Sequence, residues 1–326
     1  MRHGSRSRID IEPLHIIARR GKRARRFRRR LRAPTAAGRG RAFVLATRLR
    51  LAAAGALAVA WSGRCSRSAS PRKGGRSMLE WVTFSMREFV IAMICVFVTV
   101  QISSLCTTVY LHRALSHRAV TLHPAVEWVM RFLIWLTTGI DARAWAAVHR
   151  KHHKFSDAEG DPHSPYVHGF WQIQLGNLHY YRLEAANPET IDRYTRDIPR
   201  DWWERNVFSS TWAGNALDAA IWVIAFGPVL GVIGVLLHFA LYIFLNSSIN
   251  GAAHWIGYRN YPNSARNLWV LALLTMGEGL HNNHHEFPGS SRFSQRWWEI
   301  DAGWYTIAAL RAFGLAKPTP SLALGD

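Results

Sequence analysis

Long apolar stretches without charge are the strongest pattern in the second part of this chain. Residues 89–111 contain no charged side chain over 23 positions, which is long enough for a helix to cross a hydrocarbon core of about 30 Å. Residues 212–249 are apolar except for Asp218 and His238, and a glycine and a proline at 227–228 interrupt them. We therefore predict one membrane-spanning helix followed later by a helical hairpin.

Two further apolar stretches are weaker. Residues 124–140 include Glu127 and Arg131, whose i,i+4 spacing lets them pair on one helical face, so this segment is expected at the membrane interface or as a re-entrant helix. Residues 268–276 are too few to span. A soluble helical protein with apolar core helices is the alternative, and the 23-residue uncharged run disfavours it.

The pattern as a whole predicts an all-α fold. We expect an integral membrane helical bundle with about four membrane-embedded segments, capped by a histidine-rich helical domain at 141–206 and 277–326. The capping domain is expected on the cytoplasmic side, because basic residues lie near the histidines. These are Arg113, Arg118, Arg143, Arg150, Lys151 and Lys154.

Charge is distributed very unevenly along the 326 residues. The chain carries a formal net charge of +20, and residues 1–77 hold 22 Lys and Arg against two acids, so residues 78–326 are neutral. A block of like charge repels itself and is expected to be disordered. A nucleic-acid tail, an anionic-lipid anchor and a targeting segment are alternative functions for it. We interpret it as translated upstream sequence with Met78 as the true start, and we expect no nucleic-acid partner.

Cysteines contribute little to the picture. The three cysteines, Cys65, Cys95 and Cys106, include no CxxC pair, and two of them lie in an apolar run. A disulfide framework, a zinc finger and a thiol redox motif are therefore all disfavoured.

Histidines are the composition feature that points to chemistry. Fourteen of the 16 histidines lie between residues 112 and 285, and eight form three clusters. The clusters are HRALSH (His112, His117), HRKHH (His149, His152, His153) and HNNHH (His281, His284, His285). The i, i+3, i+4 spacing of the second and third clusters places three imidazoles on one face of a helix. Isolated histidines such as His123, His168 and His238 are expected to be structural or on the surface.

Crowded imidazoles indicate metal binding, because protonated rings this close would repel each other. Eight are too many for one tetrahedral zinc, so two metals are predicted. Imidazole suits iron, copper, nickel or zinc, and the sequence alone leaves that choice open. Two imidazole-rich irons beside membrane helices would suit attack by activated oxygen on an unactivated C–H bond of a lipid chain.

The strings HRALSH, HRKHHKFSD with DPHSP, and HNNHHEFPGSSRFS resemble the membrane fatty-acid desaturases. The resemblance is to the acyl-CoA delta-9 (stearoyl-CoA type) branch in its short bacterial form. It covers nearly all of residues 78–326, including NPETIDRY, INGAAHWIGYRNY and the RWWEIDAGW tail. Residues 78–326 are therefore identified as a membrane fatty-acid desaturase domain.

This resemblance implies a di-iron centre with nine histidine ligands and one asparagine that acts through water. Eight histidines are those of the three clusters; the ninth matches His254 and the asparagine matches Asn250. Residue spacing by itself would not select His254 over His238. The family lines the bend of its acyl tunnel with a tryptophan that matches Trp145, and Asn246 stands where animal relatives have a threonine, which leaves chain length and double-bond position open.

Polar residues beside the clusters are expected to support them. Asp157, Asp161 and Glu286 are placed to orient imidazole N–H groups, although loop and helix-cap roles fit them equally well. His163, in DPHSP, recurs in the family motif and is expected to be structural or to support the ligands.

The expected reaction takes a saturated acyl chain, O₂ and two electrons, and gives a cis double bond. No flavin or dinucleotide fingerprint is present in residues 78–326, so an external ferredoxin or cytochrome with its reductase would supply the electrons. The substrate is a fatty acyl-CoA or a phospholipid-esterified chain. The lipid bilayer is the other expected partner, and the bacterial inner membrane, with the active site facing the cytoplasm, is the expected location.

Three other functions remain open from the sequence. A membrane di-iron fatty-acid or sterol hydroxylase uses similar histidine clusters. A nonenzymatic membrane metal transporter or sensor would need more polar residues inside its spans than 89–111 provides. A nucleic-acid binder would depend on residues 1–77.

Overall fold

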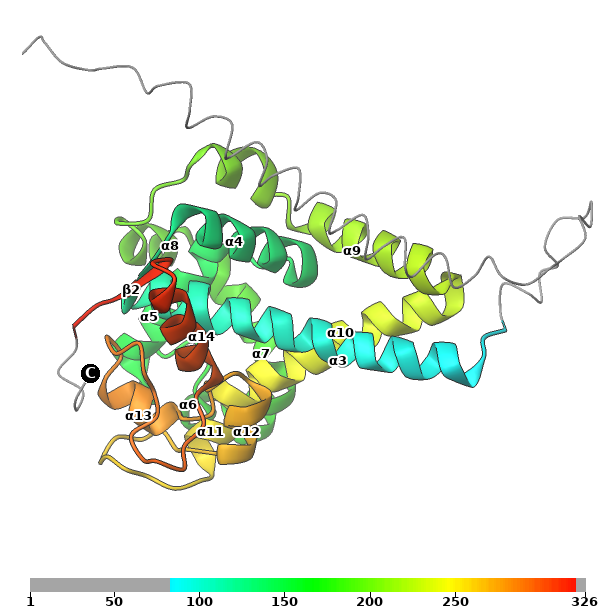
Figure 1. Ribbon diagram of the computed structural model, residues 1–326. Helices are drawn as coiled ribbons and strands as arrows, with labels where there is room; N and C mark the ends of the chain where they lie inside the picture. Colours follow the sequence, from blue (N-terminus) through cyan, green and yellow to red (C-terminus); the bar gives the residue numbers. More distant parts are fainter. Residues whose placement is uncertain (1–82, 321–326) are drawn as a thin grey trace, which may run out of the picture. The chain divides into compact units, whose positions relative to one another are not determined.

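The computed structural model describes residues 83–320, so the predicted basic head and Met78 lie outside the described residues. The described part is mostly helical (Figure 1). Its longest elements come from the apolar stretches of the sequence. The remaining helices are short and surround the histidines, so the fold divides into long apolar helices and a compact region that holds the polar chemistry.

The first apolar stretch forms one continuous helix. Helix α3 (Met86–Cys106) begins at a capping box, in which Ser85 and Glu88 bond each other's backbone N–H groups. It continues without a break into a π-helical segment, η1 (Thr107–Ser116). The combined helix Met86–Ser116 is long and apolar enough to cross a membrane.

The predicted helical hairpin is confirmed. Helix α9 (Thr211–Phe226) and helix α10 (Pro228–Asn250) pack against each other and are separated by Gly227, whose φ of 83° is accessible to glycine at no steric cost. Pro228 is the first residue of α10. A backbone N–H at that position would have no partner within the helix, so proline removes no hydrogen bond there. Pro228–Trp255 is the second helix long enough to span a membrane, whereas α9 has only 16 residues.

Helix α4 (Pro124–Thr138) fills most of the predicted interfacial segment, but its charges pair differently from the prediction. Arg131 lies 3.9 Å from Glu127, yet it approaches Asp201 at 2.6 Å and Glu204 at 3.1 Å. Arg131 therefore makes shorter contacts with another part of the chain in addition to the expected i,i+4 pair. Arg131 ties α4 to the segment that precedes α9.

The other elements are short and connect the long helices to the histidine region. In chain order the helices are α5 (Ala142–Phe155), α6 (Pro165–His168), α7 (Phe170–Ala185), α8 (Pro188–Tyr194), η2 (Glu204–Phe208), α11 (Ala252–Trp255), α12 (Trp269–Leu274), α13 (His281–Glu286) and α14 (Ala302–Ala312). The all-α prediction missed one feature. Strand β1 (Val120–Leu122) pairs antiparallel with β2 (Ala316–Pro318), with Thr121 opposite Lys317.

Two apolar clusters hold these helices together. Val96, Val100, Trp222 and Val235 join α3, α9 and α10 where they cross. A second cluster lies under η1 and α4 and reaches Ile307 of α14. The second cluster anchors the end of η1, from which the first histidines project.

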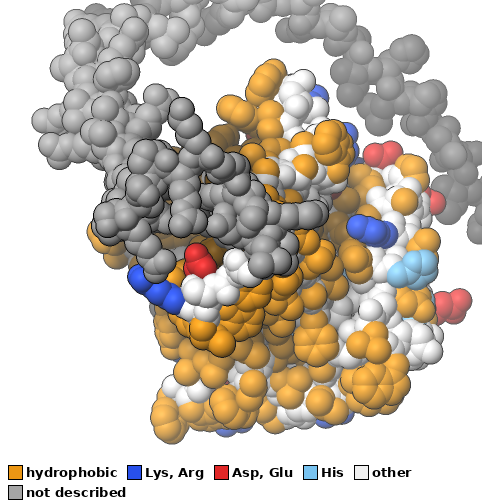
Figure 2. All heavy atoms as spheres, turned by 90° about the vertical axis from the view of Figure 1, so that its right-hand side faces the viewer, with side chains coloured by type: hydrophobic (Ala, Val, Ile, Leu, Met, Phe, Trp, Pro, Cys, Tyr) orange, Lys and Arg blue, Asp and Glu red, His pale blue; other side chains and the backbone are white. Residues whose placement is uncertain are grey.

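The outer surface of the long helices is strongly apolar. On the side where α3 and α10 begin and α9 ends, Figure 2 shows described residues whose side chains are largely hydrophobic. Ile224 is 81% exposed and Leu236 is 61% exposed. Contiguous apolar surface of this kind is unfavourable in water and is typical of contact with lipid.

Candidate metal centre

Nine histidines come together in two groups. Each group holds ligand nitrogens that lie within 4.8 Å of one another. The five-histidine group consists of His112, His117, His149, His153 and His284, and the four-histidine group consists of His152, His254, His281 and His285. All nine are histidines that the sequence or the family resemblance singled out.

Both HxxHH helices contribute to both groups. In α5, His149 and His153 join the five-histidine group and His152 joins the other. Helix α13 reverses this division, because His281 and His285 belong to the four-histidine group and His284 to the five-histidine group. Successive helical residues are about 100° apart, so positions i+3 and i+4 flank position i on opposite sides. One helical face thus serves two neighbouring sites.

The first cluster depends on the π-helix. His112 and His117 are five residues apart, a spacing that points two side chains away from each other in an α-helix. In η1 the backbone N–H of His117 donates to the carbonyl of His112 at 3.1 Å, an i→i+5 bond that lengthens the turn. Both imidazoles therefore face the five-histidine group.

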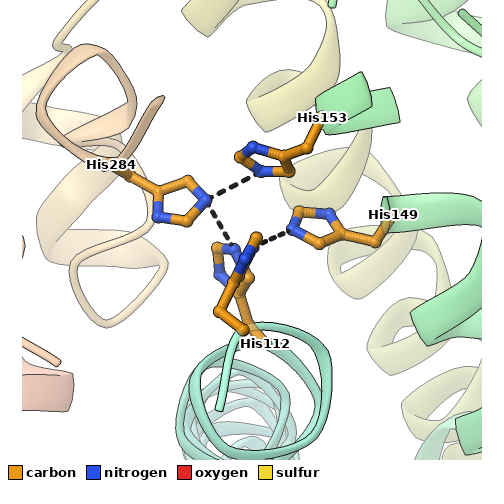
Figure 3. Close-up of side chains that lie close together, drawn as sticks. His112, His149, His153 and His284 are labelled. Atoms are coloured by element: carbon orange, nitrogen blue, oxygen red, sulfur yellow. Dashed lines mark hydrogen bonds between the residues drawn. The ribbon is translucent and has the colours of Figure 1, made fainter. Parts of the chain in front are cut away.

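The ring nitrogens that converge are mainly Nε2 atoms. His284 Nε2 lies 2.9 Å from the Nε2 atoms of both His112 and His153. In the four-histidine group, His285 Nε2 lies 3.1 Å from that of His281. Figure 3 shows His112 of η1, His149 and His153 of α5, and His284 of α13 turned toward one another.

Burial keeps four of these imidazoles neutral. The pKa values of His149, His153, His281 and His284 lie well below 6.5, first because burial disfavours the charged ring and then because other histidines are close. Neutral rings that face each other at hydrogen-bond distance bring lone pairs together. A cation at the centre of each group removes that conflict, so the donor set fits metal ions.

Three buried carboxylates orient rings of this centre. His152 Nδ1 bonds Asp161 at 2.9 Å, His254 Nδ1 bonds Asp157 at 2.7 Å, and His112 Nδ1 lies 2.5 Å from Glu278. A carboxylate on Nδ1 fixes the tautomer and leaves Nε2 as the metal-facing lone pair. The three carboxylates therefore hold their histidine rings in the orientation in which the Nε2 atoms converge.

The carboxylates stay ionised in spite of burial. Burial by itself would raise the pKa of Asp161, but the electrostatic interaction with the His152 ring and the hydrogen bond from it outweigh this and lower the pKa below its usual range. The pKa of Glu278 is lowered in the same way by His112 and Arg113. Sequence reasoning missed Glu278, which lies three residues before the third cluster in GEGLH.

Glu286 does not have the predicted contact with an imidazole. Its side chain is exposed, and its carboxylate accepts from the Asn263 amide at 3.3 Å. The residue is the last of α13. His163 is buried beside His152, with ring centroids 4.9 Å apart.

The two asparagines of HNNHH hold α13 in place, which sequence reasoning also missed. Asn282 accepts from the backbone of Asn260 and donates to the carbonyl of Ala265. Asn283 donates to Glu299 at 2.9 Å. Both are fully buried with their amides bonded on both sides, so they join the 258–267 loop and the 293–299 segment to the histidine helix.

Arg113 is not a surface charge, contrary to its use in the prediction of orientation. It is fully buried, pairs with Asp301 at 2.7 Å and lies over the Phe293 ring at 3.7 Å. Phe293 in turn packs on His284 with centroids 4.6 Å apart. Arg118 and Arg150 are also paired, both with Asp197, and Lys151 pairs with Glu184.

A cavity opens beside the metal centre. His112, His149 and His281 line its metal end, and side chains of α5, α7, α9 and α10 form its walls. Trp145 stacks on His149 with centroids 4.8 Å apart. Asn246 lines the cavity and donates to its own helix at Tyr242. Asn250 also lines it, and its amide nitrogen donates to Asn177 at 3.3 Å.

Fold and site define a helical membrane protein with an imidazole-rich centre whose donor set fits metal ions and with an adjoining cavity. The family model for fatty acid desaturases matches residues 87–316. The chain therefore belongs to the fatty acid desaturase family, in its delta-9 desaturase-like branch, and is an oxidoreductase acting on fatty acyl chains.

Named relatives support this assignment. The chain is 32% identical to the delta-9 desaturase-like 2 protein of Arabidopsis thaliana, over 66% of its own length and 72% of the relative's. It is 33% identical to the sn-1 stearoyl-lipid 9-desaturase of Synechocystis sp., over 64% and 65% of the two lengths. The sn-2 palmitoyl-lipid 9-desaturase of Nostoc sp. is 32% identical, over 64% and 74%.

Proposed function

We propose that this protein inserts a cis delta-9 double bond into a saturated acyl chain at a di-iron centre formed by the nine grouped histidines. The observation that carries the proposal is the opening of the cavity onto both histidine groups, with His112 and His149 from one and His281 from the other in its lining. A methylene segment in the cavity would lie against both metals.

The reaction removes one hydrogen from each of two neighbouring carbons. Two electrons and two protons from a donor complete the reduction of O₂ to two waters. The irons supply the oxygen activation when bound. The protein holds the Nε2 lone pairs in place through Asp157, Asp161 and Glu278, and its cavity excludes water and positions the chain.

Several cavity residues have proposed roles in positioning. Trp145 and Asn246 line the acyl tunnel, and the rigid stack of Trp145 on His149 supports a role in fixing which carbons face the metals. Asn250 acts on the four-histidine group through water, and its unused amide oxygen is free to accept from it.

For the acyl carrier, we favour a membrane lipid over CoA. Two of the relatives are named as acting on stearoyl-lipid and palmitoyl-lipid. The exposed apolar surface of the long helices supports lateral entry of a substrate that already resides in the bilayer. The exposed Arg182 at the edge of the cavity would suit a phosphate of either carrier.

For topology, we propose that α3, α4, α9 and α10 are the membrane-embedded segments of a bacterial inner-membrane protein. The metal centre would face the cytoplasm, and a ferredoxin or cytochrome with its reductase would deliver electrons there. The basic residues near the histidines support this orientation, because the positive-inside rule counts Lys and Arg whether or not they are paired. Residues 78–326 would hold the desaturase domain.

Product analysis tests the proposal. The gene would be expressed in a host that lacks its own desaturase, and mass spectrometry would locate double bonds in separated phospholipid and acyl-CoA pools. We expect a cis delta-9 double bond that appears first in phospholipid. Appearance first in acyl-CoA would reverse the choice of carrier. A hydroxylated product without a double bond would indicate the related hydroxylase reaction instead.

A further inference from the structure

His163 is a buried imidazole whose two ring nitrogens have no hydrogen-bond partner among the described residues. It lies in the DPHSP motif between α5 and α6, and only 5% of its surface is exposed. A neutral imidazole has one donor and one acceptor, and leaving both unpaired inside a protein is unfavourable. The ring therefore needs a partner that is not a protein side chain.

The position of His163 limits what that partner is. Its ring is next to His152 of the four-histidine group, and the ligand atoms of His163, His152 and Asp161 lie within 4.8 Å of one another. His163 also lines the cavity, together with His281 of the same group and Asn250. The imidazole thus lies between the four-histidine group and the space that opens beside it.

Contacts with neighbouring residues do not explain why the two ring nitrogens of His163 are unpaired. Asp161 accepts from His152 Nδ1 and from the backbone N–H groups of Asp157 and His163, and it makes no hydrogen bond with the His163 ring. A separate metal held by His152, Asp161 and His163 would need His152 Nδ1, which is committed to Asp161. The two unpaired nitrogens of His163 are therefore explained neither by a hydrogen bond to Asp161 nor by a third metal.

The four-histidine group has one imidazole fewer than the five-histidine group, so a small ligand would bind at the four-histidine group. If the four-histidine group holds iron, which takes more than four ligands, four protein nitrogens would leave a coordination position for a ligand from solvent. A water bound in that position, on the side of the cavity, would lie close to the His163 ring.

We propose that His163 is a positioning residue that hydrogen-bonds to the water or small anion bound at the four-histidine group. This inference rests on the proposed function, because it takes that group to hold iron. His163 would share the ligand with Asn250, whose amide nitrogen is engaged by Asn177 and whose oxygen is left to accept. The two residues come from different elements and would fix the ligand from two directions.

Azide binding tests the role without depending on turnover. Full-length protein, purified in detergent and loaded with iron, would be titrated with azide while the visible absorbance of the oxidised centre is recorded. We expect His163→Leu to keep two irons but to bind azide about fivefold to tenfold more weakly, the loss of one hydrogen bond. His163→Gln, which retains a donor and an acceptor, is expected to restore most of the affinity.

A control and two contrary outcomes complete the design. His168→Leu removes a nearby ring that bonds the Asp161 carbonyl at 3.2 Å, and it is expected to leave azide affinity unchanged. Wild-type azide affinity in His163→Leu would overturn the inference, as would loss of one iron, which would make His163 a ligand. A wild-type protein that takes up no iron would instead defeat the proposed function.

Discussion

At the scale of single residues, each imidazole belongs to one metal group, so substitutions in one helix should have separable effects. We expect His149→Ala to release metal from the five-histidine group and His152→Ala to release it from the four-histidine group. Each variant should retain about one iron of two and form no unsaturated product. Iron content by mass spectrometry and fatty-acid analysis by gas chromatography would check this.

The control for these variants is His179→Ala, because His179 is exposed on α7 and belongs to neither group. It should retain both irons and full activity. If His149→Ala or His152→Ala also retained them, the ligand assignment would be wrong.

A second prediction concerns Asp161, the carboxylate that orients His152. Asp161→Asn preserves shape but removes the negative charge that fixes His152. We expect iron affinity at the four-histidine group to fall about 10–100-fold, measured by competition with a chelator. Glu286→Gln, on the exposed end of α13, should leave the iron affinity unchanged. An equal loss of affinity in both variants would contradict the assignment of Asp161, and not Glu286, as the residue that orients a ligand.

The lowered pKa values of the imidazoles predict how the metal-free protein responds to pH. Six histidines have pKa values well below 6.5: His117, His149, His153, His281, His284 and His285. Below about pH 6.5 the unfolded chain binds protons there that the folded chain does not. The free energy of unfolding therefore falls with decreasing pH, by up to about 1.4 kcal/mol per pH unit for each histidine.

We accordingly expect the melting temperature of metal-free protein in detergent to drop steeply between pH 6.5 and 5 and to change little from pH 8 to 7. Iron-loaded protein should resist acid further, because metal and protons compete for the same nitrogens. Tryptophan fluorescence would follow the transitions. A flat profile for the metal-free protein would show that these rings are not buried neutral.

Residue spacing predicted eight of the nine grouped histidines, and the ninth shows the limit of that reasoning. His254 and His238 are both single histidines in or near apolar sequence. Only the folded chain separates them, because His238 Nε2 bonds the Thr137 carbonyl at 2.8 Å whereas His254 reaches the metal group. Glu278 was missed for the same reason, since its partner His112 is far away in the chain.

At the scale of elements, the close contact between α9 and α10 depends on glycine. A Cβ on Gly231 would lie 2.5 Å from the Trp222 carbonyl oxygen and 2.7 Å from Val223 Cα, atoms of the backbone that cannot move aside alone. We expect Gly231→Ala to separate the hairpin and to destabilise the protein by about 1–3 kcal/mol. Thermal unfolding in detergent would measure the loss.

Gly176→Ala is the matched control. Gly176 is also helical, but a Cβ there meets only Tyr180 at 3.9 Å, so the change should be neutral or slightly stabilising. Equal losses in the two variants would argue that helix propensity, and not packing of α9 on α10, determines the effect.

Hydrophobic pattern predicted the long elements well and the short ones poorly. The uncharged run and the glycine-proline break determine α3, α9 and α10 locally. The pairing of β1 with β2 and the contacts of Arg131 join segments far apart in the chain, which periodicity does not report. The π-helix was not predicted either, although the HxxxxH spacing of His112 and His117 favours it.

At the scale of the whole molecule, every residue of the two metal groups lies within residues 112–285. We expect a chain lacking residues 1–77 to insert in the membrane, bind two irons and form the same unsaturated product as the full chain. Lipid analysis of matched expression strains would test this. Loss of folding or activity would show that the desaturase domain needs more than residues 78–326.

The division of α13 between both groups has a consequence for biosynthesis. His284 completes one set of ligands, and His281 and His285 complete the other, so neither set is whole until the ribosome has passed residue 285. By then α3, α9 and α10 have all been translated. If the two groups hold iron as proposed, loading would be a late maturation step on a chain whose long apolar helices have already been synthesised, and iron would have to be delivered to a membrane-resident intermediate.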